Sequence, residues 1–192
     1  MNVNEAIIRR RSVRQYQDRP VEPQLLQKLL EVMPYYMSPA NLQPLKFLAV
    51  SDPEVCRRVF PALKWAAYLP GYTITREQEP QAYIVILGDK SVCKEFQFAA
   101  GSATTALSLA AYELGLDSCC LASADRNALY PLLGIDPEEM ELLYVISLGY
   151  GAHGGRTVPM EDSCRYYLEG QDFVVPKRRL EDIVRFDRWD NG

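Results

Sequence analysis

Residues 99–120 read AAGSATTALSLAAYELGLDSCC, and this stretch decides the fold. It supplies most of a predicted helix over residues 92–114, which Gly115 ends, and nearly all of its side chains are small. Small side chains let neighbouring backbones approach closely, so we expect a central helix that is packed on every side. A second copy of the chain is one candidate for such a neighbour. A short strand over residues 118–122 follows at once.

On either side of this stretch, helix and strand patterns alternate along the chain. We expect helices at residues 4–11, 25–33, 53–60, 126–133 and 180–184, and strands at 46–50, 82–87 and 142–148. Val3, Ile7 and Ile8 mark the expected buried side of the first helix. We predict a single domain over residues 1–192. Its last part, about 150–192, shows little apolar periodicity before Leu180, so we expect an arm that packs on a partner subunit.

The bulk composition bounds the possible functions. The chain has 192 residues, of which 48% are apolar and 24% charged, as in an ordinary globular protein. Its net charge of −4 disfavours a general nucleic-acid binder. No stretch approaches the roughly 18 apolar residues that cross a membrane. The first residues reach an arginine run without the apolar block of a signal peptide, so we expect a cytoplasmic protein.

Cysteine and histidine usage argues against a metal site. The five cysteines show no C-x-x-C spacing, which disfavours a disulfide framework and a zinc or iron–sulfur centre. Cys119 and Cys120 are adjacent in an apolar run, so we expect both in the core. His153 is the only histidine, which argues against a multi-histidine metal site and a Ser-His-Asp triad.

Two groups of cationic side chains stand near opposite ends of the chain. The first group contains Arg10, Arg11 and Arg14 around Ser12, and the second contains Lys177, Arg178 and Arg179. Guanidinium forks beside a hydroxyl suit a phosphate or the carbonyl groups of a ring. In an acidic protein they predict a small anionic ligand. The alternatives are a solvated basic helix end for the first group and a solubilising charge run for the second.

Two loops carry further motifs. Residues 38–44 read SPANLQP, and the amides of Asn41 and Gln43 suit the edge of a heteroaromatic ring, although a plain turn uses the same residue types. Residues 149–154 match G-x-G-x-x-G, but no helix pattern opens at Gly154, so we reject a dinucleotide site and expect a flexible exit from the strand. No side-chain nucleophile stands out, so we expect the reactive atom to belong to a cofactor.

Taken together, these pieces resemble the nitroreductase family. Residues 5–16, EAIIRRRSVRQY, are similar to its RRSVRxF/Y signature, and residues 39–44, PANLQP, are similar to its PSxxNxQPW loop. Residues 101–119 resemble its long helix and ELGLGSCW strand. The LGYG turn at residues 148–151 and the basic residues before residue 180 resemble its ending. The resemblance covers almost the whole chain in the right order, and this ordered set is more specific than any single motif.

The resemblance implies an α+β fold with a central, mostly antiparallel sheet flanked by helices. It also implies a homodimer that exchanges its C-terminal extension and binds FMN at each of two subunit interfaces. The implied FMN contacts are Arg10, Arg11, Ser12 and Arg14; Pro39, Ala40, Asn41 and Gln43 in the loop of the second subunit; Leu121, Ala122 and Ser123 near the ring; and Lys177 or Arg178 at the phosphate.

The implied activity is ping-pong hydride transfer from NAD(P)H, through flavin N5, to an electron-poor aromatic, namely a nitro compound or a quinone, or to a similar acceptor. The alternatives are other flavin chemistry on the same scaffold, namely reductive dehalogenation or flavin cleavage, and a non-catalytic module that binds a phosphate ligand. The chain departs from the family pattern at Leu45, where a tryptophan is usual. It is also short, so Trp65, Tyr68 and Tyr72 are our candidates for the substrate-pocket lid, with loop packing as the alternative.

Overall fold

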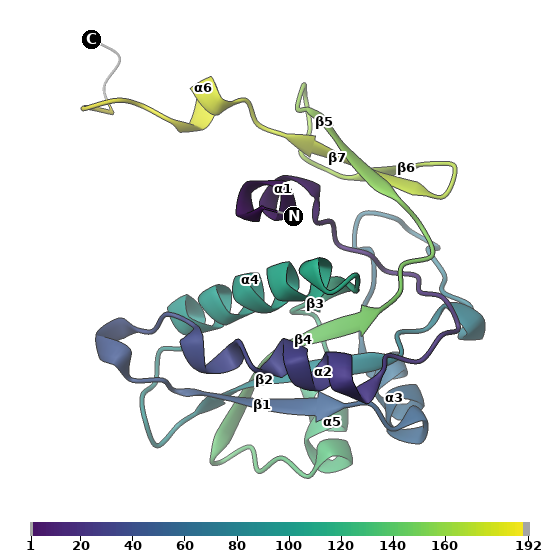
Figure 1. Cartoon of the computed structure of the whole chain (residues 1–192), viewed down its shortest axis with the longest axis vertical. Coiled ribbons are helices and arrows are strands. Elements are labelled where there is room, and N and C mark those ends of the chain that lie inside the picture. Colours follow the sequence, from purple (N-terminus) through teal and green to yellow (C-terminus); the bar gives the residue numbers. More distant parts are fainter. Residues whose placement is uncertain (1, 190–192) are drawn as a thin grey trace.

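A four-stranded antiparallel sheet forms the centre of the computed structural model, which describes residues 2–189 (Figure 1). Its strands are β1 (Leu45–Val50), β2 (Ala82–Asp89), β4 (Met140–Gly149) and β3 (Asp117–Leu121), in the spatial order β1-β2-β4-β3. All three pairings are antiparallel. The prediction of an α+β fold with a mostly antiparallel sheet flanked by helices is therefore confirmed.

Both faces of the sheet are covered by helices. Successive side chains of a strand point to opposite faces, and on β2 both sets are buried: Ile84 and Ile86 belong to one core, and Tyr83 and Val85 to the other. The first core includes residues of α2 (Pro23–Leu30) and α4 (Gln97–Glu113), and the second includes residues of α3 (Pro53–Val59) and α5 (Arg126–Leu133). Figure 1 shows these two pairs of helices on opposite sides of the sheet. Short 3-10 turns occupy residues 33–35, 39–41, 60–62 and 76–78.

The central helix α4 begins at Gln97, later than the predicted residue 92. Phe96 is buried directly over Gly88, where an added Cβ would lie only 2.6 Å from the aromatic ring. The backbone before Gln97 is therefore used to bring this ring onto the sheet. The small side chains of α4 are buried as expected, among them Ala99, Ala103 and Ala111.

The C-terminal part of the chain forms a second sheet that the sequence did not reveal. It contains β5 (Gly155–Pro159), β7 (Asp172–Lys177) and β6 (Tyr167–Glu169), in that spatial order, and is followed by the short α6 (Leu180–Ile183). In Figure 1 this ribbon lies apart from the central sheet, beyond α1 (Val3–Arg9). The sequence pattern predicted no strands in residues 155–177, and the packing of this arm on a partner subunit stays a prediction.

Two burial predictions are also wrong. The side chains of Val3, Ile7 and Ile8 are 69%, 54% and 67% exposed. The residue that α1 buries is Ala6. Cys119 is buried as expected, whereas Cys120 points to the surface. The other predicted helices and strands agree with the structure within a few residues. None of the helices among residues 2–189 has the length and apolar character needed to span a bilayer.

Candidate active site

The cationic segment 10–17 is fixed across the ends of β3 and β4. The main-chain N–H of Val13 donates to the carbonyl of Ser118 at 3.1 Å. Tyr16 is fully buried, and its hydroxyl lies 2.7 Å from the Val13 carbonyl and 2.7 Å from Oγ of Ser147 on β4. These contacts hold the main chain of the segment on the sheet without using any of its arginines.

The glycines of the 149–154 turn are places where its backbone meets other side chains closely. A Cβ on Gly149 would lie 2.8 Å from the Tyr16 ring, and one on Gly154 would lie 2.8 Å from Asp172. The N–H groups of Gly151 and Gly154 donate to Asp117 at 3.2 Å and Asp172 at 2.8 Å. The turn is thus pinned rather than flexible, which corrects our expectation. A strand, β5, follows the turn, so the helix that a dinucleotide-binding motif requires is not at this place.

Arg14 extends into a cluster of aromatic side chains. Its guanidinium carbon lies 4.7 Å from the ring centroid of Tyr166 and 4.6 Å from that of Phe173. Tyr68 packs on Tyr166 at 5.0 Å, and Tyr72 meets Phe173 edge-on at 5.7 Å. We name Tyr68, Tyr72, His153, Tyr166 and Phe173 the aromatic cluster, because the His153 ring also lies 4.8 Å from Phe173.

Burial and the arginine charges shift the pKa values of side chains around Arg14. Burial raises the pKa of Tyr72 to about 12, and the nearby positive charge of Arg14 opposes this shift. Burial also raises the pKa of the Cys119 thiol, while Arg14 and Arg10 act in the opposite direction. Burial and the neighbouring charge of Arg10 lower the pKa of Arg11.

Two buried polar atoms near this segment have no hydrogen-bond partner within the described part of the chain. Among residues 2–189, Nε of Arg11 and the hydroxyl of Tyr72 are buried and have no hydrogen-bond partner. A buried polar group without a partner costs about 1–3 kcal/mol. Such atoms are therefore suitable places for a ligand with hydrogen-bonding groups.

The end of β3 lies beside the start of the 61–80 loop. The N–H of Lys64 donates to the carbonyl of Ser123 at 3.0 Å, and Leu63 and Ala124 form a β-bridge. The ring of Trp65 stacks on that of Phe60, with 5.7 Å between the ring centroids. Trp65 also packs against the core that includes α3 and α5. Of the three predicted lid residues, Tyr68 and Tyr72 therefore join the aromatic cluster, whereas Trp65 packs elsewhere.

The predicted cofactor loop around Asn41 has an unusual backbone. Ala40, Asn41 and Gln43 have positive φ angles of 48°, 54° and 50°. Left-handed conformations of non-glycine residues cost of the order of 1–3 kcal/mol each and cluster at functional sites. The loop is exposed, and Ser102 of α4 anchors it by accepting the N–H of Met37 at 2.8 Å. Within the described part of the chain, no hydrogen bond or aromatic contact joins it to Arg14.

The second cationic group lies at the far end of the C-terminal ribbon. At its near end, a Cβ on Gly155 would lie 3.5 Å from the Arg11 side chain, and Gly155 pairs with Phe173. Lys177 stands four residues further along β7, which corresponds to about 13 Å of strand. Lys177 and Arg178 are exposed, and their predicted role at a phosphate stays a prediction.

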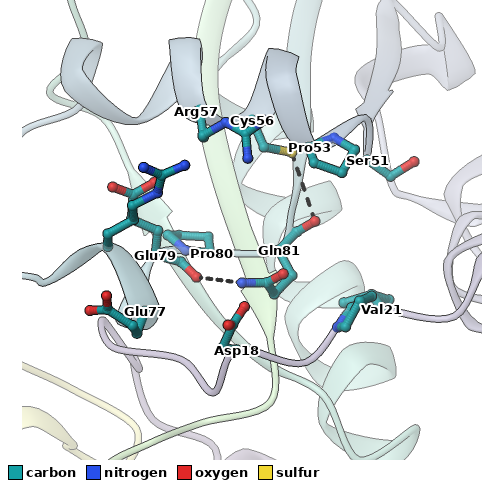
Figure 2. Close-up of a pocket in the computed structure, with 12 residues that line it drawn as sticks. Asp18, Val21, Ser51, Pro53, Cys56, Arg57, Glu77, Glu79, Pro80 and Gln81 are labelled. Carbon is teal, nitrogen blue, oxygen red and sulfur yellow. Dashed lines mark hydrogen bonds between the residues drawn. The ribbon is translucent and has the colours of Figure 1, made fainter.

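A separate cavity of about 420 Å³ opens under α3 (Figure 2). The carboxylates of Asp18, Glu77 and Glu79 line it together with Arg57 and Arg76. Burial raises the pKa of Glu79, whereas the charges of Arg76 and Arg57 act in the opposite direction. None of the predicted cofactor residues lines this cavity, so it is a poor candidate for binding a phosphate ester.

Sequence reasoning missed three members of the aromatic cluster. Tyr166 and Phe173 belong to the C-terminal ribbon, whose strands carry no periodic signal. His153 had one usable signal, since it is the only histidine and lies inside the glycine-rich turn. Nε2 of His153 accepts a hydrogen bond from the main-chain N–H of Arg14. The two residues are 139 positions apart in the sequence, a separation that no local pattern reports.

Comparison with known proteins places this arrangement in context. The sequence model of the Nitroreductase family matches residues 7–73 and 77–150. A protein of Archaeoglobus fulgidus, provisionally named NADH dehydrogenase/NAD(P)H nitroreductase, is 32% identical over 152 residues, which is 75% of this chain and 82% of that protein. A Methanothermobacter thermautotrophicus protein with the same provisional name is 29% identical over 181 residues, covering 88% of this chain and 87% of its own.

Solved structures agree with the fold. A provisionally named nitroreductase from Desulfovibrio desulfuricans, crystallised in complex with FMN, superposes with a TM-score of 0.75 at 22% identity and covers 99% of both chains. An FMN-dependent nitroreductase from Clostridium difficile has a TM-score of 0.71 at 21% identity, covering 97% of this chain and 100% of its own. The sequence match over the sheet, the central helix and the cationic segment, together with this shared fold, shows that the chain belongs to the nitroreductase family.

Proposed function

We propose that the chain is an FMN-dependent oxidoreductase that takes electrons from NAD(P)H. The observation that supports this most strongly is Arg14, whose guanidinium lies beside the packed rings of Tyr166 and Phe173, within the cationic segment. The FMN-dependent relative and the FMN-bound structure make this mononucleotide the natural candidate ligand.

The residues present fit FMN chemically. Arg10 and Arg11 offer guanidinium forks for the phosphate, and Arg11 has a buried Nε without a partner. Arg14 and the hydroxyl of Ser12 suit the ribityl chain and the pyrimidine edge. Leu121, Ala122 and Ser123 would lie beside the ring. Lys177 or Arg178 would complete the grip on the phosphate.

Bound FMN would supply the redox chemistry by accepting a hydride from NAD(P)H at N5 and passing it to the second substrate. The protein's contribution is electrostatic and steric. Arg14 would stabilise negative charge at the pyrimidine end, and its contacts with the Tyr166 and Phe173 rings hold the guanidinium in place. Tyr68 and Tyr72 belong to the aromatic cluster beside Arg14, which suits an electron-poor aromatic acceptor such as a nitro compound or a quinone.

The proposed working unit is a homodimer. A groove of about 550 Å³ runs along α4, and its rim exposes Tyr35 at 84%, Met37 at 66% and Phe98 at 61%. Apolar patches of this kind mark interaction surfaces. We assign the groove to a second copy, which would bring its Pro39, Ala40, Asn41 and Gln43 to the cofactor.

The C-terminal arm would be exchanged in this dimer. Leu180, Ile183 and Phe186 are 69%, 53% and 86% exposed, so one chain alone does not bury them. In this proposal residues 1–192 form one domain, and the residues after about 150 pack on the surface of the second copy.

The test is reconstitution with FMN followed by separate half-reactions. We expect purified protein to be yellow, or to become so with FMN, with absorption near about 450 nm, and to be bleached anaerobically by NADH or NADPH. Re-oxidation by a nitroaromatic or a quinone would identify the acceptor class. Protein that binds FMN but is not reduced by either nucleotide would contradict the proposed activity. Protein that never binds FMN would favour a module for another phosphate ligand.

A further inference from the structure

The backbone of Arg14 is held by an unusual rung of a short ladder. Residues 14–17 run beside residues 150–153, and two rungs are main-chain bonds, from Gln17 N–H to Tyr150 O at 2.7 Å and from Ala152 N–H to Gln15 O at 2.9 Å. At the next rung the N–H of Arg14 donates at 2.9 Å to Nε2 of His153. An imidazole nitrogen therefore stands where a ladder would ordinarily offer a carbonyl.

The two ring nitrogens of His153 have fixed and different roles. Nδ1 lies 2.7 Å from the carbonyl of Gly154, which only accepts, so Nδ1 carries the proton. Nε2 then keeps the lone pair that receives the N–H of Arg14. Both bonds exist together only in the neutral ring with its proton on Nδ1.

The same ring also supports the side chain of Arg14. The centroid of the His153 ring lies 4.8 Å from that of Phe173. The Phe173 centroid in turn lies 4.6 Å from the guanidinium carbon of Arg14. One side chain therefore fixes Arg14 twice, at its main chain directly and at its charged end through Phe173.

We propose that His153 is a positioning residue for Arg14, which the neutral imidazole holds in place and the protonated imidazole releases. This inference rests on the proposed FMN site, because its effect on cofactor binding runs through Arg14. Protonation of Nε2 replaces an acceptor by a donor that faces the N–H of Arg14, so the rung breaks.

The groups facing His153 set where this switch lies on the pH scale. Burial lowers the pKa of His153 below its usual 6.5, and the charge of Arg14 acts in the same direction, while the bond to Gly154 and the charges of Asp117 and Asp172 oppose it. The unfolded chain therefore binds a proton before the folded one does. The contribution of neutral His153 to the free energy of unfolding is therefore fully present above pH 6.5. It is lost as the pH falls from there toward the pKa of His153 in the folded protein.

The experiment compares FMN dissociation constants of three proteins between about pH 7.5 and pH 4.5, a window that spans histidine titration. His153→Gln supplies a non-titrating oxygen acceptor, and His153→Phe keeps the ring but removes the acceptor. The FMN phosphate also titrates, near about pH 6, but it does so equally in all three proteins. The ratio of wild type to His153→Gln is therefore the readout.

We expect this ratio to rise about threefold to tenfold from neutral pH to the acidic end, the size of one lost hydrogen bond. His153→Phe should bind weakly at every pH. A ratio that stays constant across the whole range would overturn the proposal.

A second readout does not need FMN. His153 is the only histidine of the chain, so in tag-free, nitrogen-15-labelled protein its ring resonances need no assignment. We expect the Nδ1-protonated tautomer at neutral pH and a shift of the Arg14 amide resonance that follows the His153 titration. A ring protonated on Nε2 at neutral pH would contradict the proposal. If no variant binds FMN, the proposed function fails, while these resonances still decide the role of His153.

Discussion

The Tyr16→Phe substitution tests how firmly the cationic segment is held on the sheet. Tyr16 is fully buried, and its hydroxyl lies 2.7 Å from the Val13 carbonyl and 2.7 Å from Oγ of Ser147. A phenylalanine ring keeps the packing against Gly149, so the loss is confined to these hydrogen bonds. Taking a partner away from a buried polar group costs about 1–3 kcal/mol. For a chain of this size that corresponds to a fall in Tm of about 2–12 °C.

Thermal unfolding followed by circular dichroism, with and without FMN, measures this effect. Ser147→Ala is the matched control, because it removes one neighbour of the hydroxyl but leaves the bond from Tyr16 to Val13. We expect a smaller loss for the control and a weaker FMN affinity only for Tyr16→Phe. Unchanged Tm and unchanged FMN affinity in Tyr16→Phe would refute the view that this residue anchors the segment.

Three further substitutions test separate parts of the account. Arg14→Lys loses the planar fork that packs beside the rings of Tyr166 and Phe173, so FMN affinity measured by fluorescence titration should fall about tenfold to a hundredfold; an unchanged affinity would remove Arg14 from the site. Gly149→Ala places a Cβ 2.8 Å from the Tyr16 ring and should cost about 1–3 kcal/mol in urea unfolding, whereas a neutral result would mean that the ring moves freely. Phe98→Asp puts a charge on the α4 groove and should give monomers in light scattering, while Val92→Asp, an exposed position outside the groove, should not. Equal molar masses for both variants would move the interface elsewhere.

Local patterns were enough to predict the central sheet and its helices. The apolar runs of β2 and β4 are buried on both faces, which is the environment that such runs indicate. Asp52 caps α3 through two main-chain N–H groups, as its position before Pro53 predicts. These signals are short-range, so the sequence alone reports them.

The remaining features depend on contacts that no local pattern contains. β5 and β7 pair directly in parallel although β6 lies between them in the sequence, and β5 is mostly exposed, so no alternation of apolar and polar residues marks it. The late start of α4 follows from the fit of Phe96 over Gly88. At the site, the arginines and the aromatic residues of the 61–80 loop were predictable, whereas their partners Tyr166 and Phe173 enter only when the ribbon folds back. The exposed apolar faces of α1 and α6 have no explanation within one chain, and we attribute them to the proposed dimer.

The most direct test of the account is a crystal structure of the protein grown with FMN. We predict one FMN per subunit, with its phosphate hydrogen-bonded to Arg10 or Arg11, its pyrimidine edge at Arg14, and the loop around Asn41 of a second copy against its ring. FMN bound in the acidic cavity under α3, or a site built without Arg14, would contradict the central claim.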